Sequence, residues 1–214
     1  MKKEFAQRPE TFTEQWPGEL TGHGSWAGPL VGMPSPLFVV TSYKSNGKQN
    51  ACFQSRSVFT ENNGELYCLL GWVPAWNHML TSLRETSCCV LNFPARDLMD
   101  KCWKTIEVNQ FETDEITAAG LTAEPATSIN APRIAECFLN IECEFVWERE
   151  LAPGDSSCAV VCVKALRVCM DSDYYDENKT GRYGKTGFVY SSGARNPDTG
   201  EIYDGGFAGM EIYQ

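Results

Sequence analysis

The sequence lacks the features that mark several common classes of protein. No apolar run reaches the ~18 residues of a membrane-spanning helix, so we expect no membrane partner. Cys-x-x-Cys pairs are absent and the only histidines are His23 and His78, which argues against a structural zinc site. Neither a GxGxxG fingerprint nor a GxxxxGK(S/T) loop occurs, and no histidine has an obvious Ser or Cys nucleophile as partner. These absences disfavour a Rossmann-type nucleotide site and a nucleophilic triad, and they leave chemistry on a bound cofactor open.

The charge balance and the cysteines limit the expected partners and compartment. A formal net charge of −10 repels phosphate backbones, so we expect no nucleic-acid partner. Most of the ten cysteines lie inside apolar runs such as 88–91 and 158–163, where a reduced thiol behaves as a small buried hydrophobe. Residues 1–9 are charged and contain no apolar signal-peptide core. We therefore expect reduced cysteines and a cytoplasmic protein.

Composition divides the chain into three parts. Residues 1–36 are rich in Pro and Gly, which interrupt regular elements, and we predict an arm that packs on a body or a partner subunit. Residues 37–171 contain the β patterns of a compact domain. Residues 172–214 are rich in Asp, Tyr and Gly, and we expect this extension to wrap the domain or its dimer partner. The aromatic residues that give the arm a reason to pack are Phe5, Phe12, Trp16 and Trp26.

Six segments of the body have the short apolar or β-branched pattern of strands. Turn signals separate them, above all Asn46-Gly47, because Asn-Gly readily supplies the positive φ angles of a hairpin. The predicted fold is mainly β, a small antiparallel barrel with a few short helices. The predicted strands are 37–43, 50–58, 66–72, 88–93, 138–151 and 157–170.

Helices are expected between these strands, and the longest polar alternation falls late in the chain. Asn77 is placed to cap a helix that ends near Thr86. Two more short helices are expected at 96–103 and 111–120, the second ended by Gly120. The segment 138–151 predicts a strand with one face exposed, because apolar and polar residues alternate along it. In that strand we expect Leu139, Ile141, Cys143, Phe145 and Trp147 on one face and Asn140, Glu142, Glu144 and Glu148 on the other.

Four motifs follow one another in the body. The first is the strand Pro36–Thr41 with the turn Asn46-Gly47-Lys48-Gln49-Asn50, and the second is Cys89-Val90-Leu91-Asn92-Phe93-Pro94. The third joins Gly120-Leu121-Thr122 to Ala131-Pro132-Arg133-Ile134-Ala135-Glu136-Cys137, and the fourth is Leu139-Asn140-Ile141-Glu142-Cys143. In this order and spacing they resemble the flavin reductase-like proteins with an FMN-binding split barrel, the group that includes flavoredoxins. The resemblance covers residues 36–171.

The resemblance implies an antiparallel split barrel and an FMN at the interface of a homodimer, against the strand that begins at Asn50. A flavin ring needs a flat slot with small side chains, so that backbone N–H groups reach its polar edge, and Ala51, Cys52 and Ser55 are small. Arg56 is a candidate to offset the negative charge of reduced flavin or to contact phosphate, with a solvated strand arginine as the alternative. The strand residues expected at the cofactor are Asn50, Ala51, Cys52, Gln54, Ser55, Arg56 and Ser57.

The second expected site element is the start of the helix after the third strand. Family members often carry an Arg and a Ser or Thr there for the phosphate, whereas this chain has Asn77 and Met79, with His78 between them. Asn77 and His78 are candidate hydrogen-bond donors, and a plain helix cap and an ordinary surface or packing histidine are the alternatives. Trp72 is a candidate for stacking on the flavin, beside Trp76, although both also fit core or rim positions.

The resemblance implies an FMN-dependent oxidoreductase that passes hydride from NADH or NADPH to the flavin and electrons on to free flavin, a metal complex or a protein. The absence of a catalytic constellation fits this function, because the cofactor performs the chemistry. Lys44, Lys48 and Arg84 are candidate cations for phosphate or a nicotinamide dinucleotide, with solvated charges as the alternative. Two other functions stay open: a non-catalytic flavin carrier, store or sensor on the same fold, and a barrel without flavin that mediates protein contacts.

Overall fold

The computed structural model describes residues 34–175, 187–191 and 207–210, together with residues 2, 4 and 6. Its contacts divide the chain into two units, each described here by itself. The smaller unit contains the two-residue strands β11 (Tyr190–Ser191) and β12 (Phe207–Ala208), which pair antiparallel. The larger unit, residues 36–189 with 209–214, contains the main sheet and all the described helices. The two-residue strand β1 (Ser35–Pro36) lies where the two units meet in the sequence.

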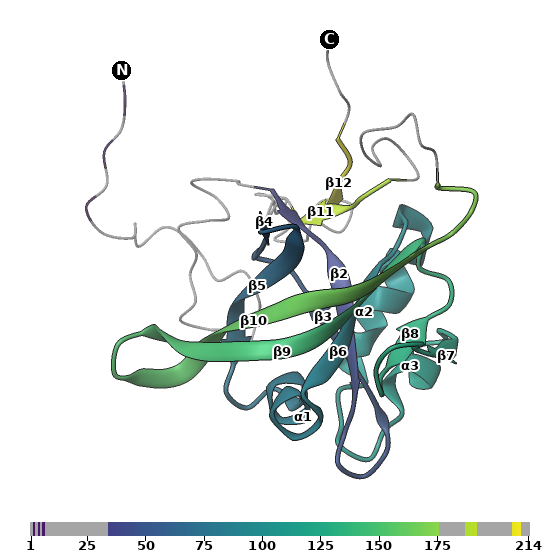
Figure 1. The fold of residues 1–214 in the computed structure, drawn as a ribbon, viewed down its shortest axis with the longest axis horizontal. Helices are drawn as coiled ribbons and strands as arrows, with labels where there is room; N and C mark the ends of the chain where they lie inside the picture. Colours follow the sequence, from purple (N-terminus) through teal and green to yellow (C-terminus); the bar gives the residue numbers. More distant parts are fainter. Residues whose placement is uncertain are drawn as a thin grey trace, which may run out of the picture. The chain divides into compact units, whose positions relative to one another are not determined.

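The main sheet has seven strands in the order β3-β2-β6-β9-β10-β5-β4, and every neighbouring pair is antiparallel (Figure 1). Apolar runs or alternation produce most of these strands, as expected from the sequence. β6 has the bounds that its apolar run predicts. The strands are β2 (Phe38–Tyr43), β3 (Gln49–Gln54), β4 (Ser57–Asn62), β5 (Glu65–Pro74), β6 (Cys88–Phe93), β9 (Leu139–Ala152) and β10 (Asp155–Met170).

The sheet curves into a barrel because its two end strands, β3 and β4, are consecutive in the chain. Arg56 lies between them with a left-handed φ of 55°, which bends the segment that the sequence predicts as one strand, 50–58. The Gly71 amide donates to the Arg56 carbonyl at 2.9 Å. A Cβ at Gly71 would lie 2.3 Å from that oxygen, so only glycine permits this approach. The predicted antiparallel split barrel is confirmed.

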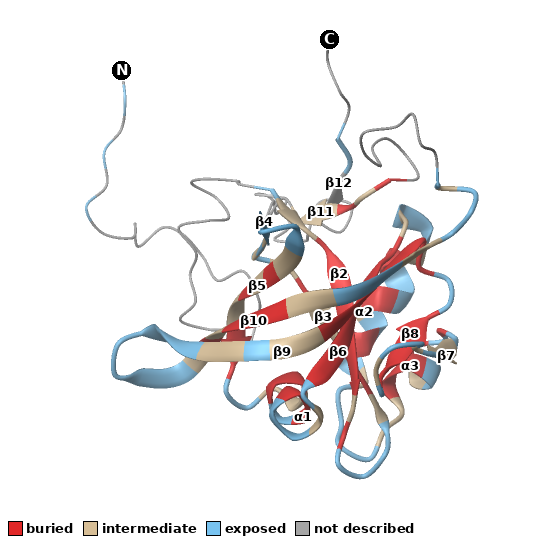
Figure 2. Ribbon diagram, in the orientation of Figure 1, coloured by how far each residue is buried: buried red, intermediate tan, exposed pale blue. Residues whose placement is uncertain are grey.

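The core fills the inside of this barrel. Phe38 of β2 meets Phe59 of β4 edge to face, with ring centroids 5.7 Å apart, and both rings contact Phe93 of β6. Figure 2 shows buried residues along β2 and β6, the second and third strands in the order of the sheet. All ten cysteines are free thiols, and most are buried, in agreement with their positions in apolar runs. The fully buried side chains of this core include Phe38, Leu70, Met79, Leu80, Leu83, Leu91 and Phe138.

Short helices and a two-stranded sheet cover the barrel. Asn77 caps α1 as predicted, and the helix spans His78–Thr86. The predicted helix 96–103 is a 3-10 turn η2 (Arg96–Leu98) that continues into α2 (Met99–Glu107). The predicted helix 111–120 is only α3 (Glu115–Ala118), because 109–114 forms turns around a buried lysine described below. The two-stranded sheet was missed by the sequence analysis and consists of β7 (Ala123–Pro125) and β8 (Pro132–Ile134), which pair with each other.

The expected half-exposed face of β9 is wrong for the first half of the strand. Asn140 and Glu142 are buried, because β7, β8 and the loop between them cover the face on which they lie. A register shift near Val146 also breaks the alternation: Phe145 lies opposite Val163 of β10, and Trp147 lies opposite the preceding Cys162. Because directly opposed residues share a face, Phe145 and Trp147 lie on opposite faces of the sheet.

The described part of the C-terminal extension packs on the barrel end. Tyr174 stacks on Phe138 with ring centroids 4.7 Å apart, and Phe188 contacts Phe93 and Phe138 edge to face. The Leu37 amide donates to the carbonyl of Val189 at 2.8 Å. The predicted packing of the N-terminal arm, with its aromatic residues, lies outside the described residues.

Candidate functional site

Strand β3 forms an end of the main sheet and presents two different faces. It pairs with β2 alone, with Cys52 opposite Val40 and Asn50 opposite Ser42. Side chains alternate along a strand, so Asn50, Cys52 and Gln54 share the inner face with the core residue Val40. Ala51 and Phe53 share the outer face, and Phe53 packs on Trp103 of α2. The three small residues expected to form one slot, Ala51, Cys52 and Ser55, therefore do not lie on one face.

The free edge of β3 presents backbone N–H groups. The Ala51 amide points away from β2 and donates to a carboxylate oxygen of Glu115 at 2.7 Å. In an antiparallel pair every second residue points its amide away from the partner, so Phe53 shares this direction. The Ala51 amide is thus committed to a side chain of the protein itself, and the outward amide of Phe53 is a candidate donor for a ligand at this edge.

The N-terminus of α1 lies against β3 through Asn77. The Asn77 side chain accepts a hydrogen bond from the Met79 amide at 2.8 Å and donates to Cys52 Sγ at 3.3 Å. Asn77 therefore caps α1, which is one of the two alternatives in the sequence analysis, and it also donates to Cys52; its role as a donor to the cofactor stays a prediction. Burial raises the pKa of the Cys52 thiol to about 11, so Cys52 is a neutral thiol at neutral pH.

Trp72 of β5 lies near the C-terminal end of β3, where it contacts Gln54 and Arg56. Gln54 donates from Nε2 to the carbonyl of Trp72 at 3.3 Å, which links β3 to β5. The guanidinium of Arg56 lies 5.6 Å from the centroid of the Trp72 ring, in a cation–π arrangement. Ser57 donates to the carbonyl of Ser55 at 3.1 Å and supports the bend. The structure therefore brings together Cys52 with Asn77 and Arg56 with Trp72, while Trp76 is 69% exposed.

His78 lies beside a buried ion pair that the sequence analysis did not predict. The carboxylate of Glu115 accepts a hydrogen bond from Lys44 Nζ at 2.9 Å, and both side chains are buried. His78 Nδ1 lies 3.7 Å from the same carboxylate oxygen. Lys44 is thus no free cation for phosphate. The signal that could have indicated this pair was weak, because a lysine before a turn is usually solvated.

Five buried polar side-chain atoms in the described part of the chain have no hydrogen-bond partner, and all are close in sequence to this ion pair or in contact with it. Such atoms are rare in folded proteins, and each calls for an explanation, such as an ordered water or a ligand. Asn50 is 1% exposed, and its side-chain amide is one of them. The five atoms are Ser42 Oγ, Gln49 Oε1, Asn50 Nδ2, His78 Nδ1 and Asp114 Oδ1.

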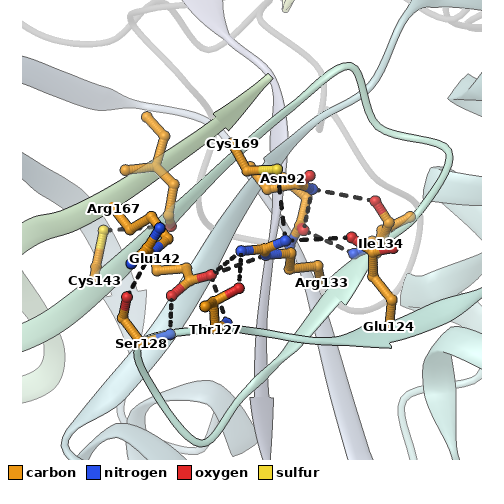
Figure 3. Close-up of polar contacts among 12 residues, drawn as sticks. Asn92, Glu124, Thr127, Ser128, Arg133, Ile134, Glu142, Cys143, Arg167 and Cys169 are labelled. Carbon is orange, nitrogen blue, oxygen red and sulfur yellow. Dashed lines mark hydrogen bonds and ion pairs between the residues drawn. The ribbon is translucent and has the colours of Figure 1, made fainter. Parts of the chain in front are cut away.

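A second buried carboxylate, Glu142 of β9, has a different environment (Figure 3). It pairs with Arg133 of β8, whose Nε donates to it at 2.9 Å, and it accepts the amides of Thr127 at 2.9 Å and Ser128 at 2.6 Å. Burial alone would raise the pKa of Glu142, but the hydrogen bonds from Thr127, Arg133 and Ser128 outweigh it and lower the pKa. This network holds the β7–β8 loop on the barrel.

Other features of the described residues limit the chemistry. An open cavity of about 630 Å³ lies by Thr86, near the C-terminal end of α1. Its lining includes Tyr43, Asn130 and the candidate cation Lys44, but none of the residues of β3 or of the start of α1 that were predicted at the cofactor. Within the described ranges, no group of three or more His, Cys, Asp or Glu side chains is arranged to hold a metal ion. None of the described helices has the length and hydrophobicity that crossing a membrane requires.

Comparison with solved structures gives the fold independent support. Flavoredoxin of Desulfovibrio vulgaris (Miyazaki F) has a TM-score of 0.71 at 15% identity, covering 100% of this chain and 96% of that one. Nitrilotriacetate monooxygenase component B from Bacillus cereus has a TM-score of 0.75 at 15% identity, covering 100% and 99%. The NADH:FAD oxidoreductase SgcE6 of Streptomyces globisporus has a TM-score of 0.59 at 13% identity, covering 76% and 84%. At such low identities the TM-scores show a shared fold and no more.

Sequence comparison identifies the family. No curated protein matches the chain. The family described as "Flavin reductase like domain" matches residues 30–185, which include the whole seven-stranded sheet and α1. The match spans well over half of the sequence and agrees with the split barrel, with its bend at Arg56 and its capped helix at Asn77. The chain therefore belongs to the flavin reductase-like family.

Proposed function

We propose that this protein is an FMN-dependent oxidoreductase that accepts hydride from NADH or NADPH and passes electrons to a free flavin, a metal complex or a protein. The observation that supports it best is the edge of β3, where outward amides and an unpartnered buried Asn50 lie in the strand that the family resemblance assigns to the flavin. When bound, the flavin supplies the two-electron chemistry, and the protein binds the ring and excludes water.

The residues present fit a flavin in several respects. The outward amide of Phe53 is the donor we assign to the polar edge of the ring, because flavin oxygens and N5 need such donors. Asn50 contributes a buried side-chain amide without a partner in the protein. Arg56 is exposed and lies over Trp72, so it is placed to add positive charge beside the ring. We assign the ring to this strand edge and to the Arg56–Trp72 pair.

The phosphate requires a separate argument, because the Arg and hydroxyl usual in the family are absent. The N-terminus of α1 carries the positive end of the helix dipole and free backbone amides, which favour an anion. His78 is the first residue of that helix and is partly exposed. We propose that the free backbone amides of the first turn of α1 hold the phosphate in place of the missing arginine.

A homodimer and a cytoplasmic location complete the proposal. Flavin at a dimer interface is implied by the family resemblance, and three exposed apolar side chains of β9 and β10 give a second copy apolar surface to cover. These are Val146, Leu166 and Val168, which are between 43% and 55% exposed. The ten free thiols support a reducing compartment. Light scattering during size-exclusion chromatography tests the dimer, and a monomer would argue against an interface site.

The decisive experiment is a flavin titration of the purified protein. We expect FMN to bind and to show flavin absorbance, with FAD and riboflavin binding more weakly, and NADH or NADPH to bleach bound FMN without oxygen. Asn50→Ala and Arg56→Ala should each weaken FMN at least about tenfold, which is about 1.4 kcal/mol. Lys48→Ala is the matched control, since Lys48 is an exposed turn residue, and it should leave the affinity unchanged.

The outcomes separate the candidate functions. FMN binding without bleaching by either nicotinamide would favour the carrier or sensor. Failure to bind any flavin would contradict the proposal and favour a barrel that mediates protein contacts. Unchanged FMN affinity in both Asn50→Ala and Arg56→Ala would remove the assignment of β3.

A further inference from the structure

The carboxylate of Glu115 is fixed from two sides in the interior. Glu115 is the first residue of α3 and is fully buried. One of its oxygens accepts the Ala51 amide at 2.7 Å, and the other accepts Lys44 Nζ at 2.9 Å. A charged group without water needs such partners, and here they come from two other elements. Glu115 therefore cannot rotate away without breaking both contacts.

Lys44 is fixed equally firmly. Its ammonium group donates to the carbonyls of Gln110 and Thr113, each at 2.7 Å, and to Glu115. An ammonium group has three donors, so all three are used. The turns at 109–114 thus wrap around Lys44 and hold it against Glu115. The pair is a rigid unit beside the start of α1.

His78 presents one ring nitrogen to this unit and the other edge to solvent. Its Nδ1 is buried, has no hydrogen-bond partner, and lies 3.7 Å from a Glu115 oxygen. The side chain as a whole is 28% exposed, so the exposed part is the opposite edge with Nε2. Phe111 packs edge to face on the imidazole with centroids 6.0 Å apart, which restricts rotation of the ring. A shift of about 0.7 Å would make the contact a hydrogen bond.

The groups that face His78 are few. Glu115 of α3 lies 3.7 Å from His78 Nδ1, Lys44 at the end of β2 binds the same Glu115 oxygen, and the neutral thiol of Cys52 accepts a hydrogen bond from the neighbouring Asn77. Lys44 offsets the charge of Glu115, so the carboxylate acts on His78 mainly as a fixed acceptor. An acceptor at Nδ1 selects the tautomer in which Nδ1 carries the proton. Nε2 is then the basic nitrogen, and it faces outward.

We propose that His78 is the proton-exchanging residue of the flavin site and that Glu115 is its positioning residue. This rests on the proposed function, which supplies the hydride. When an organic acceptor takes up hydride, an anion on oxygen or nitrogen remains. The Nε2–H bond of protonated His78 then breaks, its proton goes to that anion, and its electron pair stays on Nε2. Neutral His78 regains a proton from solvent, so the step balances.

A purely structural role explains this arrangement poorly. Replacing a buried ion pair by apolar residues of similar volume is often neutral or stabilising, so burial of the Lys44–Glu115 pair is weak evidence for a purely structural role. A structural pair would also be expected to leave no partnerless atoms beside it, as at Glu142. Here His78 Nδ1 and Asp114 Oδ1 are both without partners. The geometry instead fits a carboxylate that orients a histidine at the mouth of a site.

The first test is the tautomer of His78 in the wild-type protein without flavin. Nitrogen-15 NMR of the ring distinguishes Nδ1–H from Nε2–H, and the chain has only two histidines, so His23→Gln assigns the signals. We expect mainly Nδ1–H in neutral His78. The Glu115→Gln variant should shift the population toward Nε2–H, whereas Glu85→Gln, an exposed change of equal charge on α1, should not. Predominant Nε2–H in the wild type would overturn the proposal.

The second test follows proton transfer with flavin bound. Reduced holoprotein is mixed with a quinone across a range of pH, and the oxidation rate is recorded. In His78→Gln we expect the rate to fall about tenfold or more at neutral pH and to lose its pH dependence, with FMN still bound. Glu115→Asp should restore part of the rate lost in Glu115→Gln. An unchanged pH profile in His78→Gln would refute the proton role.

The two tests distinguish a failure of the proposed function from a failure of the inference about His78. The tautomer is measured without flavin, so a protein that binds no flavin would end the proposed function while the orientation of His78 could still be established. A protein that binds FMN and is bleached by a nicotinamide, but has Nε2–H at His78, would retain the proposed function and lose this inference.

Discussion

Two buried carboxylates, Glu142 and Glu115, each pair with one cation, but their surroundings differ. Glu142 accepts two backbone amides in addition to Arg133, and these donors lower its pKa despite burial. Burial raises the pKa of Glu115 in spite of the Ala51 amide and Lys44. Among the unpartnered buried side-chain atoms of the described residues, His78 Nδ1 lies 3.7 Å from a Glu115 oxygen and Asp114 Oδ1 belongs to the residue before Glu115, whereas none belongs to Thr127, Ser128 or Arg133, which bind Glu142. We interpret the fully hydrogen-bonded, saturated network of Glu142 as one that stabilises the barrel, and the partly unpaired, unsaturated surroundings of Glu115 as the candidate place for chemistry.

The largest effect should come from breaking the saturated network. Arg133→Met leaves the Glu142 carboxylate buried without its cation, and we expect a loss of about 3–5 kcal/mol in the free energy of unfolding. Urea denaturation followed by tryptophan fluorescence measures it. Adding Glu142→Leu should recover only part of the loss, because the amides of Thr127 and Ser128 still lack their acceptor. A loss below about 1 kcal/mol would contradict the structural role assigned to this network.

Breaking the unsaturated pair should give a smaller loss that depends on pH. We expect Lys44→Met to cost about 3 kcal/mol at neutral pH, because it leaves Glu115 charged and buried. The folded pKa of Glu115 is raised, so the stability that its protonation contributes is present below about pH 4.3 and is lost as pH rises through the folded pKa. The cost of Lys44→Met should therefore shrink as the pH is lowered through that range.

The stability cost of Arg133→Met should depend on pH differently from the cost of Lys44→Met. The folded pKa of Glu142 is lowered, so its stabilising contribution is present above about pH 4.3 and is lost only as pH falls through the lower folded value. The cost of Arg133→Met should thus persist to more acidic pH than the cost of Lys44→Met. Urea denaturation of both variants from pH 7 to pH 4 tests whether the cost of Lys44→Met declines at a higher pH than the cost of Arg133→Met. Equal pH dependence of the two costs would contradict the difference inferred between Glu115 and Glu142.

The smallest effect should come from an exposed pair of the same chemistry. Arg84 of α1 contacts Glu148 of β9 at 2.7 Å, but the Arg84 side chain is half exposed. Water screens such pairs, so Arg84→Met should cost less than about 1 kcal/mol in the same denaturation experiment. A larger cost would mean that the exposure of an ion pair does not determine how much the pair contributes to the free energy of unfolding.

Local patterns in the sequence predict much of this fold. The apolar run 88–93 and the capping Asn77 correspond directly to β6 and α1. The bend at Arg56 was missed, because an arginine in a left-handed conformation has no local signal. β7 and β8 were missed because three-residue strands are too short for a periodicity.

The candidate site was harder to predict than the fold. Asn50, Cys52 and Asn77 were predicted from resemblance, and the structure brings Cys52 and Asn77 into contact. The Lys44–Glu115 pair joins residues 71 positions apart, and the sequence pattern around each is that of a solvated charge. Ala51 was expected to serve the cofactor, but Glu115 takes its amide. Contacts between residues so far apart in the sequence depend on which strands and turns become neighbours in the folded barrel, and local sequence patterns do not show this.

The close approach of Gly71 to the carbonyl of Arg56 has a consequence for how the protein can vary. The barrel closes at this point only because Gly71 has no Cβ atom. Sliding β5 by one residue along β4 would bring Leu70 or Trp72 to that carbonyl, and neither side chain fits. This one position therefore locks the alignment of the two strands, and with it the segment from Asn50 to Ser57.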